Sequence, residues 1–564
     1  MKHISLHIPR FEIDGVQILD KISLLFNAND RIAVVGPNGA GKTTLMKVIT
    51  GEIEVPDATF ENTGSLSLGY LSQIHFDTED ILVKEELRLA FSDILQLEVD
   101  LEVAEANMES PGGIEHYTEV LERYHMLGGY DYEREIDRVA RGLGIFELLG
   151  RSVREVSGGQ RTKIALAKVL LSRPEFLFLD EPTNFIDLAS VEWLETYLNE
   201  TWKGGYMIIS HDREFLDQTT TLVFEVVAGK MTVYHGNYTA YMKERNKNFE
   251  KSEKLFEEQQ EFIKSEKTLI NRFRAGSRAG FAKSREKALE KVEILEKPEA
   301  NFRPTFLWNF GENASERVLF IKEAFIGRTD PLFYINELTL YGKNRIGIVG
   351  ENGVGKSTLL KTILGKIPLL DGRIIQGKGV EAVYYSQMHE ELDFGVSLYA
   401  NYERLVGTIT RERLAGLLGY YGFTFHDIDK PMFAFSGGQV SKILFAIIGQ
   451  KSANLLILDE PTNHLDYDSR EALEYSLRGY KGTILFISHD RYFVNRLATH
   501  LWIIDNGEVS LSYGNYNDYK LKVERGIDFD MSLWNDDGEL SMVLEEKLGK
   551  NEAKRIKAKF ARTW

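Results

Sequence analysis

The 564-residue chain contains no cysteine, which excludes disulfides and thiolate metal sites. It also lacks any run of about 18 apolar residues, the length that a membrane-spanning helix needs. The first residues, Met1 to Ser5, lack the apolar segment of a signal peptide. We therefore expect a soluble, cytoplasmic protein with no membrane partner.

Positive charge is in deficit, with 68 Lys and Arg against 85 Asp and Glu and a formal net charge of −17. This balance argues against a surface that binds nucleic acid everywhere, but it leaves room for a local basic patch. A chain of this length is too long for a single hydrophobic core. Several domains are therefore expected.

The first candidate site is a glycine-rich loop that follows a short β-rich run, Arg31 to Val35. Its glycines let successive backbone N–H groups surround phosphate, Lys42 reaches the terminal phosphates, and the Thr43 hydroxyl is a Mg²⁺ ligand. The helix expected from Thr44 to Thr50 adds its N-terminal dipole to this anion site. The loop and the first helical residue are Gly36, Pro37, Asn38, Gly39, Ala40, Gly41, Lys42, Thr43 and Thr44.

Three further motifs follow in the first half. A buried-strand run, Phe176 to Leu179, ends in Asp180 and Glu181, which suit Mg²⁺ binding and polarisation of an attacking water. His211 follows another strand-like run and is placed to contact a γ-phosphate. A small turn at a helix start suits phosphate contact through backbone donors and consists of Ser157, Gly158, Gly159 and Gln160. Taken singly, each motif is also compatible with an ordinary strand end, turn or structural histidine.

The second half repeats every motif in the same order. Its glycine-rich loop is Gly350, Glu351, Asn352, Gly353, Val354, Gly355, Lys356, Ser357 and Thr358. The other counterparts are Gln387 for Gln73, Ser436, Gly437, Gly438 and Gln439 for the turn, Asp459 and Glu460 for the acids, and His489 for His211. Two ordered sets exclude coincidence and indicate two copies of one nucleotide-binding domain.

The spacing of the two sets locates an insertion. Lys356 follows Lys42 by 314 residues and Gln387 follows Gln73 by 314, whereas Glu460 follows Glu181 by only 279. The first half therefore carries 35 extra residues, which we place within 82–137. This charged, helix-rich stretch is either an arm that contacts a partner or an enlarged helical subdomain, and the sequence leaves both open.

A charged hairpin from Lys243 to Lys297 joins the two halves. The first arm of the hairpin repeats apolar residues every seven positions, as the seam of a coiled coil does. They are Phe249, Phe256, Ile263 and Ile270, with Leu255, Phe262 and Leu269 one place before. The second arm repeats Phe281, Ala288 and Leu295 at the same period. Gly276 and Gly280 break the pattern between the two arms. Basic residues outnumber acids near this turn, so the hairpin supplies the local basic patch.

Each half resembles an ATP-binding cassette. That resemblance implies that ATP and Mg²⁺ bind between the two cassettes, with the P-loop of each facing the Ser-Gly-Gly-Gln signature of the other. The first composite site would combine 36–43 with Gln73, Asp180, Glu181, His211 and 436–439, and the second 350–357 with Gln387, Asp459, Glu460, His489 and 157–160. Glu181, Glu460, His211 and His489 would be catalytic, and the metal ligands would be Thr43, Gln73, Asp180, Ser357, Gln387 and Asp459.

Over essentially its whole length the chain resembles the ABC-F family, which fuses two cassettes through a basic helical linker. The Glu-Pro-Thr-Asn run after each catalytic acid, 181–184 and 460–463, supports the resemblance. It implies a monomeric ATPase that closes on itself, binds the ribosome at the tRNA exit site, and contacts large-subunit rRNA and P-site tRNA to regulate translation elongation. The RNA contacts would be Arg272, Arg274, Arg278, Lys283, Arg285 and Lys287.

Other functions remain possible from the sequence. The hairpin could be a spacer with a solvated basic face, and the protein could be an antibiotic-resistance, ribosome-protection member of the same family. A DNA-repair cassette protein is disfavoured because its coiled coil is far longer and lies inside a cassette. A transporter-associated ATPase would leave the basic turn unexplained.

The expected fold class is α/β, with cassettes at 1–242 and 301–526, a helical linker at 243–300, and an acidic spacer and basic C-terminal helix at 527–564.

Some positions depart from the family pattern. Phe185-Ile186-Asp187 replaces the His-Leu-Asp that the second half keeps at His464, and Val440-Ser441-Lys442 is less basic than Arg161-Thr162-Lys163. Phe11 and Phe325 lie near the position of an adenine-stacking aromatic, but the first half aligns Ile13 there, so base stacking stays unassigned.

Overall fold

The computed structural model of the chain describes residues 2–13, 16–37, 39–71, 80–184, 186–273, 279–289, 292, 295, 303–311 and 315–525. The predictions on Asn38, Gln73, Phe185, Arg274, Arg278, the Gly276 turn and the C-terminal segment 526–564 lie outside these residues. The side chains of Ile13 and Phe281 also lie outside the description.

The first cassette contains two sheets. An antiparallel sheet has the order β2-β1-β4, and a six-stranded, mainly parallel sheet has the order β5-β6-β7-β3-β8-β9. The strands at the centre of the parallel sheet are buried on both faces, as their continuous apolar sequences require. The strands are β1 (His3–Ile13), β2 (Val16–Asn27), β3 (Arg31–Val35), β4 (Thr59–Thr63), β5 (Leu68–Leu71), β6 (Phe176–Asp180), β7 (Gly205–Ile209), β8 (Leu222–Val227) and β9 (Lys230–His235).

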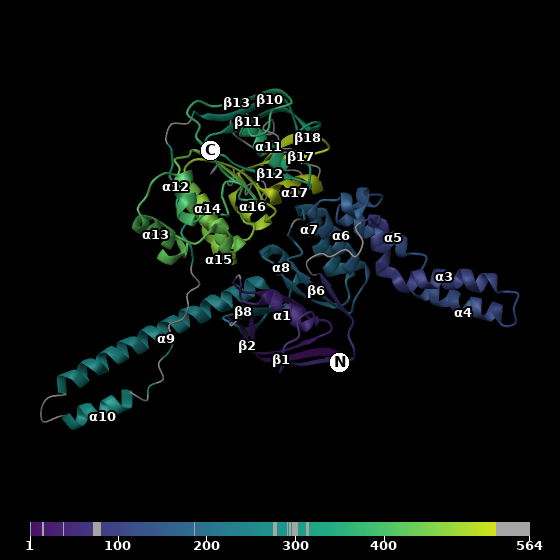
Figure 1. Ribbon diagram of the computed structural model, residues 1–564, viewed down its shortest axis with the longest axis horizontal. Coiled ribbons are helices and arrows are strands. Elements are labelled where there is room, and N and C mark those ends of the chain that lie inside the picture. The colour runs from purple at the N-terminus through teal and green to yellow at the C-terminus, as the bar shows by residue number, and fades with distance from the viewer. Residues whose placement is uncertain are drawn as a thin grey trace.

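Helices cover this sheet, and two of them leave it. The helices are α1 (Lys42–Ile49), α2 (Val83–Arg88), α3 (Ser92–Ala106), α4 (Gly113–Met126), α5 (Tyr132–Gly142), α6 (Gly158–Leu171), α7 (Leu188–Thr196) and α8 (Arg213–Thr219). Helices α3 and α4 form a hairpin that projects away from the cassette (Figure 1). The hairpin lies in the stretch where the spacing places the 35 extra residues, so the insertion has the shape of an arm.

The second cassette repeats this plan in one nine-stranded sheet of order β13-β10-β11-β18-β17-β12-β16-β15-β14. The two sheets merge here because β11 pairs with β18 at Tyr334 and Glu508. Its strands are β10 (Arg317–Gly327), β11 (Pro331–Tyr341), β12 (Arg345–Gly350), β13 (Asp371–Gln376), β14 (Ala382–Tyr385), β15 (Leu455–Asp459), β16 (Thr483–Ile487), β17 (His500–Asp505) and β18 (Glu508–Tyr513). Its helices are α11 (Lys356–Ile363), α12 (Leu398–Leu405), α13 (Arg411–Gly419), α14 (Gly437–Ile448), α15 (Tyr467–Arg478), α16 (Arg491–Leu497) and α17 (Tyr516–Arg525).

The linker is a helical hairpin made of α9 (Tyr238–Phe273) and α10 (Ala279–Leu289). Helix α9 has 36 residues and is therefore about 54 Å long at 1.5 Å per residue. It starts five residues before the expected boundary, as a continuation of the first cassette. The seam residue Ile270 is buried, but Leu255 and Phe262 of the neighbouring row are 57% and 48% exposed, because α10 faces only the end of α9 that is far from the cassettes.

The two cassettes face each other, and the linker hairpin and the α3–α4 hairpin extend from them in different directions (Figure 1). The predicted α/β class, with two P-loop cassettes and a helical linker, is confirmed. Of the helices in the described ranges, none combines the length and the apolar character needed to cross a bilayer.

The burial of Ile270 generates a prediction for the hairpin. Ile270→Ala removes a buried side chain and leaves a cavity, so α10 should open at least about ten times more often. Amide hydrogen exchange over 279–289 measures this opening. Leu255→Ala on the same helix is the matched control and should leave the exchange unchanged. Equal exchange in both variants would contradict the packing described for α10.

Candidate functional site

Both P-loops lie at the carboxyl end of a central parallel strand, β3 or β12, and lead directly into α1 or α11. The first loop runs very close to strand β8, since a Cβ at Gly36 would lie 2.1 Å from the Val226 carbonyl oxygen. Glycine is required there. The Nζ of Lys42 donates to the carbonyl oxygens of Gly36 and Pro37, both at 2.9 Å, and Lys356 makes the same contacts with Gly350 and Glu351 at 2.7 and 3.0 Å. Both lysines therefore point into their own loops.

The acid pairs stand at the ends of β6 and β15, which are separated from the P-loop strands by one strand, β7 or β16. The Ser357 hydroxyl donates to Asp459 Oδ1 at 3.1 Å, and the pKa of Asp180 is shaped by burial and by a hydrogen bond from Thr43. Burial raises the pKa of both aspartates. In each cassette the hydroxyl and the carboxylate proposed for one metal ion thus lie within contact distance.

The catalytic candidates form a matching pair of carboxylate and imidazole in each cassette. His211 Nε2 lies 3.3 Å from Glu181 Oε1, and His489 Nε2 lies 3.4 Å from Glu460 Oε1. Both glutamates adopt the left-handed backbone region, with φ of 50° and 51°. Strained residues of this kind concentrate at functional sites because the surrounding fold must hold them there.

Burial sets the protonation of these pairs. It raises the pKa of Glu181 to about 7, against the nearby positive charge of Arg470, and raises the pKa of Glu460 to about 8. It lowers the pKa of His489 to about 3 and that of His211 well below its usual value. Both imidazoles are therefore neutral at pH 7, and the raised pKa makes each carboxylate a stronger proton acceptor once it is ionised.

The signature turns begin helices α6 and α14. Ser157 Oγ accepts from the Gln160 N–H at 3.4 Å while Gln160 Oε1 accepts from the Ser157 N–H at 2.9 Å. Ser436 and Gln439 form the same capping box. Such boxes fix the start of the helix, and the N–H groups that remain there are donors for an anion.

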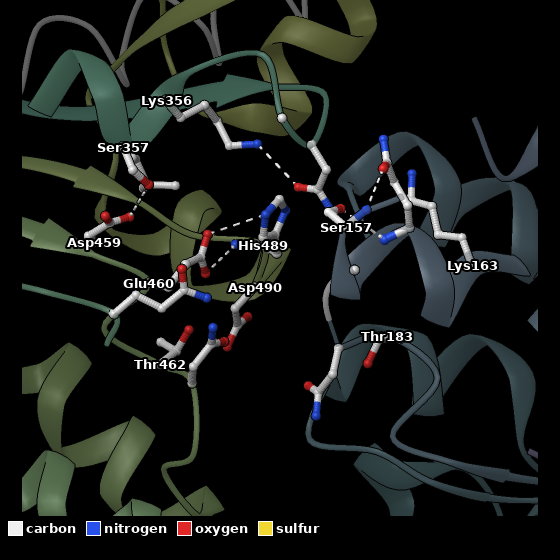
Figure 2. A pocket seen from close by; sticks show the side chains of 18 of the residues that line it. Ser157, Lys163, Thr183, Lys356, Ser357, Asp459, Glu460, Thr462, His489 and Asp490 are labelled. Atoms are coloured by element: carbon white, nitrogen blue, oxygen red, sulfur yellow. Dashed lines mark hydrogen bonds and ion pairs between the residues drawn. The ribbon is translucent and has the colours of Figure 1, made fainter. Parts of the chain in front are cut away.

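The structure brings the second composite site together across the two cassettes. A cavity of about 390 Å³ is lined by residues of the second P-loop, by Gln387, Asp459, Glu460 and His489, and on the facing wall by Ser157, Gly159 and Gln160. Figure 2 shows Lys356, Ser357, Asp459, Glu460 and His489 on one side and Ser157, Lys163 and Thr183 on the other. The volume and the two facing phosphate-binding elements fit a nucleotide held between cassettes.

The first composite site faces the other signature helix. A cavity of about 310 Å³ is lined by Gly36 and Pro37 of the first P-loop and by Gln439 of α14. Asp466 also lines it, and its negative charge acts on the Lys42 ammonium. Of the residues predicted for the first site, Gly36, Pro37 and Gln439 therefore share this cavity. Lys42 and His211 line a smaller cavity beside it, and Thr43, Asp180 and Glu181 line neither of the two.

An ion pair, buried in the first cassette and half-buried in the second, holds the segment after each candidate catalytic acid against the signature helix. Lys163 of α6 lies 2.5 Å from Asp187, and Lys442 of α14 lies 3.2 Å from Asp466. Each aspartate also caps the next helix, accepting from the backbone N–H of Ser190 or Ser469 at 2.9 Å. The divergent residues before Asp187 therefore leave its own contacts the same as those of Asp466.

Sequence reasoning missed three residues of the site: Tyr384, its counterpart Tyr70 and Arg470. The Tyr384 hydroxyl donates to Asp459 Oδ2 at 3.2 Å, and Tyr70, 314 residues earlier, lies near Asp180; partial burial and the Asp180 charge raise the Tyr70 pKa. The shared offset was the only signal available, because a tyrosine on a strand is common. Arg470, the third residue, lies in α15 of the second cassette and contacts the carbonyl oxygen of His211 in the first.

The two candidates for adenine stacking, Phe325 and Phe11, have different surroundings. Phe325 is 39% exposed and its ring lies 4.9 Å from that of Tyr334, whereas Phe11 packs against the core of the first cassette. The two cassettes thus present different aromatic surroundings at equivalent positions.

The residues present fit Mg²⁺ bound together with nucleotide phosphates. Mg²⁺ prefers oxygen ligands and is held by one or two carboxylates plus substrate phosphates. Ser357 with Asp459, and Thr43 with Asp180, supply such oxygens beside the P-loops. Within the described ranges, no cluster of three or more His, Cys, Asp or Glu side chains forms a metal cage by itself.

Comparisons with known proteins agree with this geometry. The family described as ABC transporter matches residues 19–184 and 335–463, and a related extension of the same description matches 224–306. The chain is 35% identical over 90% of its length to a putative ATP-binding protein, YdiF, of Bacillus subtilis, covering 80% of that protein. It is 32% identical over 98% of its length to ABC transporter F family member 5 of Arabidopsis thaliana, covering 81% of it.

A solved structure shares the arrangement of the whole chain. The archaeal ribosome recycling factor aABCE1, crystallised with the ribosomal stalk protein aP1, matches with a TM-score of 0.58 at 17% identity over 98% of both chains. At this identity the likeness concerns the fold alone.

The Tyr384 contact predicts an effect on metal use. Tyr384→Phe removes the hydrogen bond that orients Asp459, so the Mg²⁺ concentration for half-maximal ATP hydrolysis should rise about ten-fold. Tyr399→Phe, which removes a hydroxyl that donates to the Ile409 carbonyl, is the control and should leave the Mg²⁺ requirement unchanged. A Mg²⁺ titration of hydrolysis measures both. An unchanged requirement in Tyr384→Phe would exclude this orienting role.

Proposed function

Because the chain belongs to the ABC-F family of ATP-binding cassette proteins and is an ATP hydrolase, we propose that it binds the ribosome and couples cassette closure to translation elongation. The binding position proposed is the tRNA exit site, with large-subunit rRNA and P-site tRNA as contacts. The observation that carries the proposal is a long hairpin that is basic near its turn and anchored beside a nucleotide site at its root. A protein of similar fold works on ribosomes in archaea, which supports the proposal only through the fold.

We assign the chemistry to the residues that line the two composite sites. Glu181 and Glu460 orient the attacking water and accept its proton, and the backbone N–H groups of His211 and His489 hold these carboxylates in place. Within the described residues, the buried Glu460 Oε1 has no hydrogen-bond donor at bonding geometry, so it is an acceptor available to water in the cavity. Lys42 and Lys356 stabilise the phosphates, and Mg²⁺, when bound, neutralises charge that develops on the phosphate oxygens.

Closure is proposed to depend on nucleotide because neither site is complete in one cassette. The P-loop of each cassette reaches phosphate from one side, and the signature helix of the other reaches it from the opposite side. ATP would thus hold the interface closed, and hydrolysis would weaken it and release the protein.

The linker is proposed to follow this closure through its root. Arg245 of α9 lies 2.7 Å from Glu225 of β8, and the Tyr241 hydroxyl donates to the same carboxylate at 2.7 Å. Glu225 pairs with Val35, the residue directly before the first P-loop. The second cassette has Val523 at the position equivalent to Arg245 and Ile503 at that of Glu225, so only the first P-loop is tied to the linker in this way.

The distal part of the hairpin presents the charge that RNA binding needs. Lys264, Lys267, Lys283 and Lys287 are exposed, whereas Arg285 forms an ion pair with Glu266 and is half-buried. Lysines on such a surface neutralise phosphates and release counterions from RNA. The exposed lysines, rather than Arg285, are therefore the main candidates for RNA contact.

The α3–α4 arm is proposed to make a second contact with a partner. Val103 is 57% exposed and Met126 is 75% exposed on this hairpin, together with other apolar side chains. A subdomain that served only to enlarge the cassette would bury such groups. This favours the partner-contact alternative for the insertion.

The central experiment traps the closed state. Glu181→Gln combined with Glu460→Gln removes both proton acceptors, so the protein should bind ATP without hydrolysing it and cosediment with ribosomes. Lys42→Ala combined with Lys356→Ala is the control, since it should neither bind ATP nor cosediment. If the Gln variant retained ATP but sedimented free of ribosomes, the ribosome proposal would be wrong and the ATPase would stand.

A second experiment tests the hairpin charge. Lys283→Glu with Lys287→Glu, made in the Gln-trapped variant, should weaken ribosome binding at least ten-fold at 100 mM salt and flatten its salt dependence. Lys247→Glu with Lys251→Glu changes the same charge on exposed positions near the root and is the matched control. Binding isotherms at several salt concentrations provide the measurement. Equal weakening by both pairs would contradict a specific contact near the turn.

A further inference from the structure

The guanidinium of Arg470 contacts the loop after β7 in the first cassette, at His211, and the equivalent loop after β16 in the second, at Asp490. Arg470 lies in the first turn of α15 and is 8% exposed. Its Nε donates to the Leu465 carbonyl at 2.9 Å, in its own cassette, and its Nη1 donates to the His211 carbonyl at 3.0 Å, in the other cassette. Nη1 also lies 3.5 Å from Asp490 Oδ2. With three fixed oxygen partners, the side chain has a single arrangement.

The contact ends on a catalytic candidate of the first site. The His211 carbonyl belongs to the same residue whose Nε2 lies 3.3 Å from Glu181, and the His211 N–H donates to Glu181 Oε2 at 3.3 Å. A shift of this backbone therefore moves both groups that face Glu181. Since Leu465 directly precedes Asp466, which lines the first cavity, Arg470 links that segment of the second cassette to the catalytic pair of the first.

Among the described residues, the first cassette has no equivalent of Arg470 that could contact the catalytic loop of the second. Asp187 and Asp466 are equivalent helix caps separated by 279 residues, and the same offset places Val191 opposite Arg470. Val191 is buried and has no hydrogen-bonding side chain, so it cannot donate to the backbone of His489. The two composite sites therefore differ at this position although their catalytic residues match.

We propose that Arg470 is a positioning residue that makes hydrolysis in the first composite site depend on the seating of the second cassette, and that Val191 gives the second site no such dependence. Opening of the interface withdraws the guanidinium from the His211 carbonyl, which frees the loop that holds Glu181. Hydrolysis at the first site is thus confined to the closed state. The second site is free to turn over with a less exact seating of its partner.

The test measures each site separately by single-turnover hydrolysis of labelled ATP in the full chain. In the Glu460→Gln background, where the first site alone is active, Arg470→Met should slow hydrolysis about ten-fold or more and change the ATP concentration for half-maximal rate by less than three-fold. In the Glu181→Gln background, which reports the second site, the same substitution should slow hydrolysis by no more than about three-fold, because Arg470 lines that cavity and contacts the Asp490 side chain but donates to neither backbone group of His489. Equal losses at both sites, or no loss at the first, would overturn the proposal.

Two further variants separate positioning from general stability. Arg470→Lys keeps the charge and one donor, so it should restore hydrolysis at the first site to within about three-fold of the parent. Arg496→Met removes an arginine that pairs with Glu474 at 3.0 Å and does not contact His211, and it should leave both sites unchanged. If Arg496→Met slowed the first site as much as Arg470→Met, the effect would be one of overall charge or folding.

Hydrogen exchange gives a readout that does not depend on turnover. With ATP bound in the doubly Gln-substituted protein, Arg470→Met should speed exchange at the amides of 209–213, where a backbone contact is lost, at least three-fold more than at 487–491, where only the contact with the Asp490 side chain is lost. The two segments are equivalent loops and therefore serve as an internal control. Equal gains in both loops would indicate a general loosening of the interface and would contradict the proposal.

Discussion

The interface between the two cassettes is the contact on which the rest of the structure depends, because each candidate nucleotide site is lined by P-loop residues of one cassette and by signature residues of the other. A buried ion pair contributes to that interface. Arg491 of α16 donates to Glu195 of α7, with Nη1 3.0 Å from Oε2, and the hydrogen bond raises the pKa of Arg491 against the effect of burial. Breaking one partner of such a pair is costly, so the orientation of the cassettes is well defined.

The interface is not symmetric although the two cassettes repeat each other. Arg491 makes an ion pair with the opposite helix, while its counterpart Arg213 lies over the Tyr467 ring, 3.8 Å from its centre. A second difference is that Arg470 donates to the backbone of the opposite cassette, whereas its counterpart Val191 is a buried apolar side chain. The two cassettes therefore share their P-loop, signature and candidate catalytic residues, whereas the side chains between the two sites differ.

At this interface the linker is fixed by its root to both cassettes. Its root is fixed by Arg245 and Tyr241 to Glu225, next to the first P-loop, and Tyr238 at its start packs against Tyr467 of the second cassette with ring centres 5.8 Å apart. A helix of 36 residues amplifies a small rotation at such a root into a displacement of several ångströms near its turn. In the function that we propose, the position of the basic surface follows the state of the cassettes.

The sequence alone determined the parts whose structure is local. A glycine-rich loop between a buried strand and a helix, an acid pair at a strand end and a capped signature turn each occupy a few consecutive residues, so their order and spacing predicted two cassettes, a linker and a 35-residue insertion. The seven-residue period predicted that α9 is helical, but not that α10 covers only the far end of α9 and leaves Leu255 exposed. Tyr384, Glu225 and Arg470 could not be found in this way, because their roles come from partners 75, 20 and 259 residues away. Only the tertiary structure brings these polar groups together, and burial then gives each contact its strength.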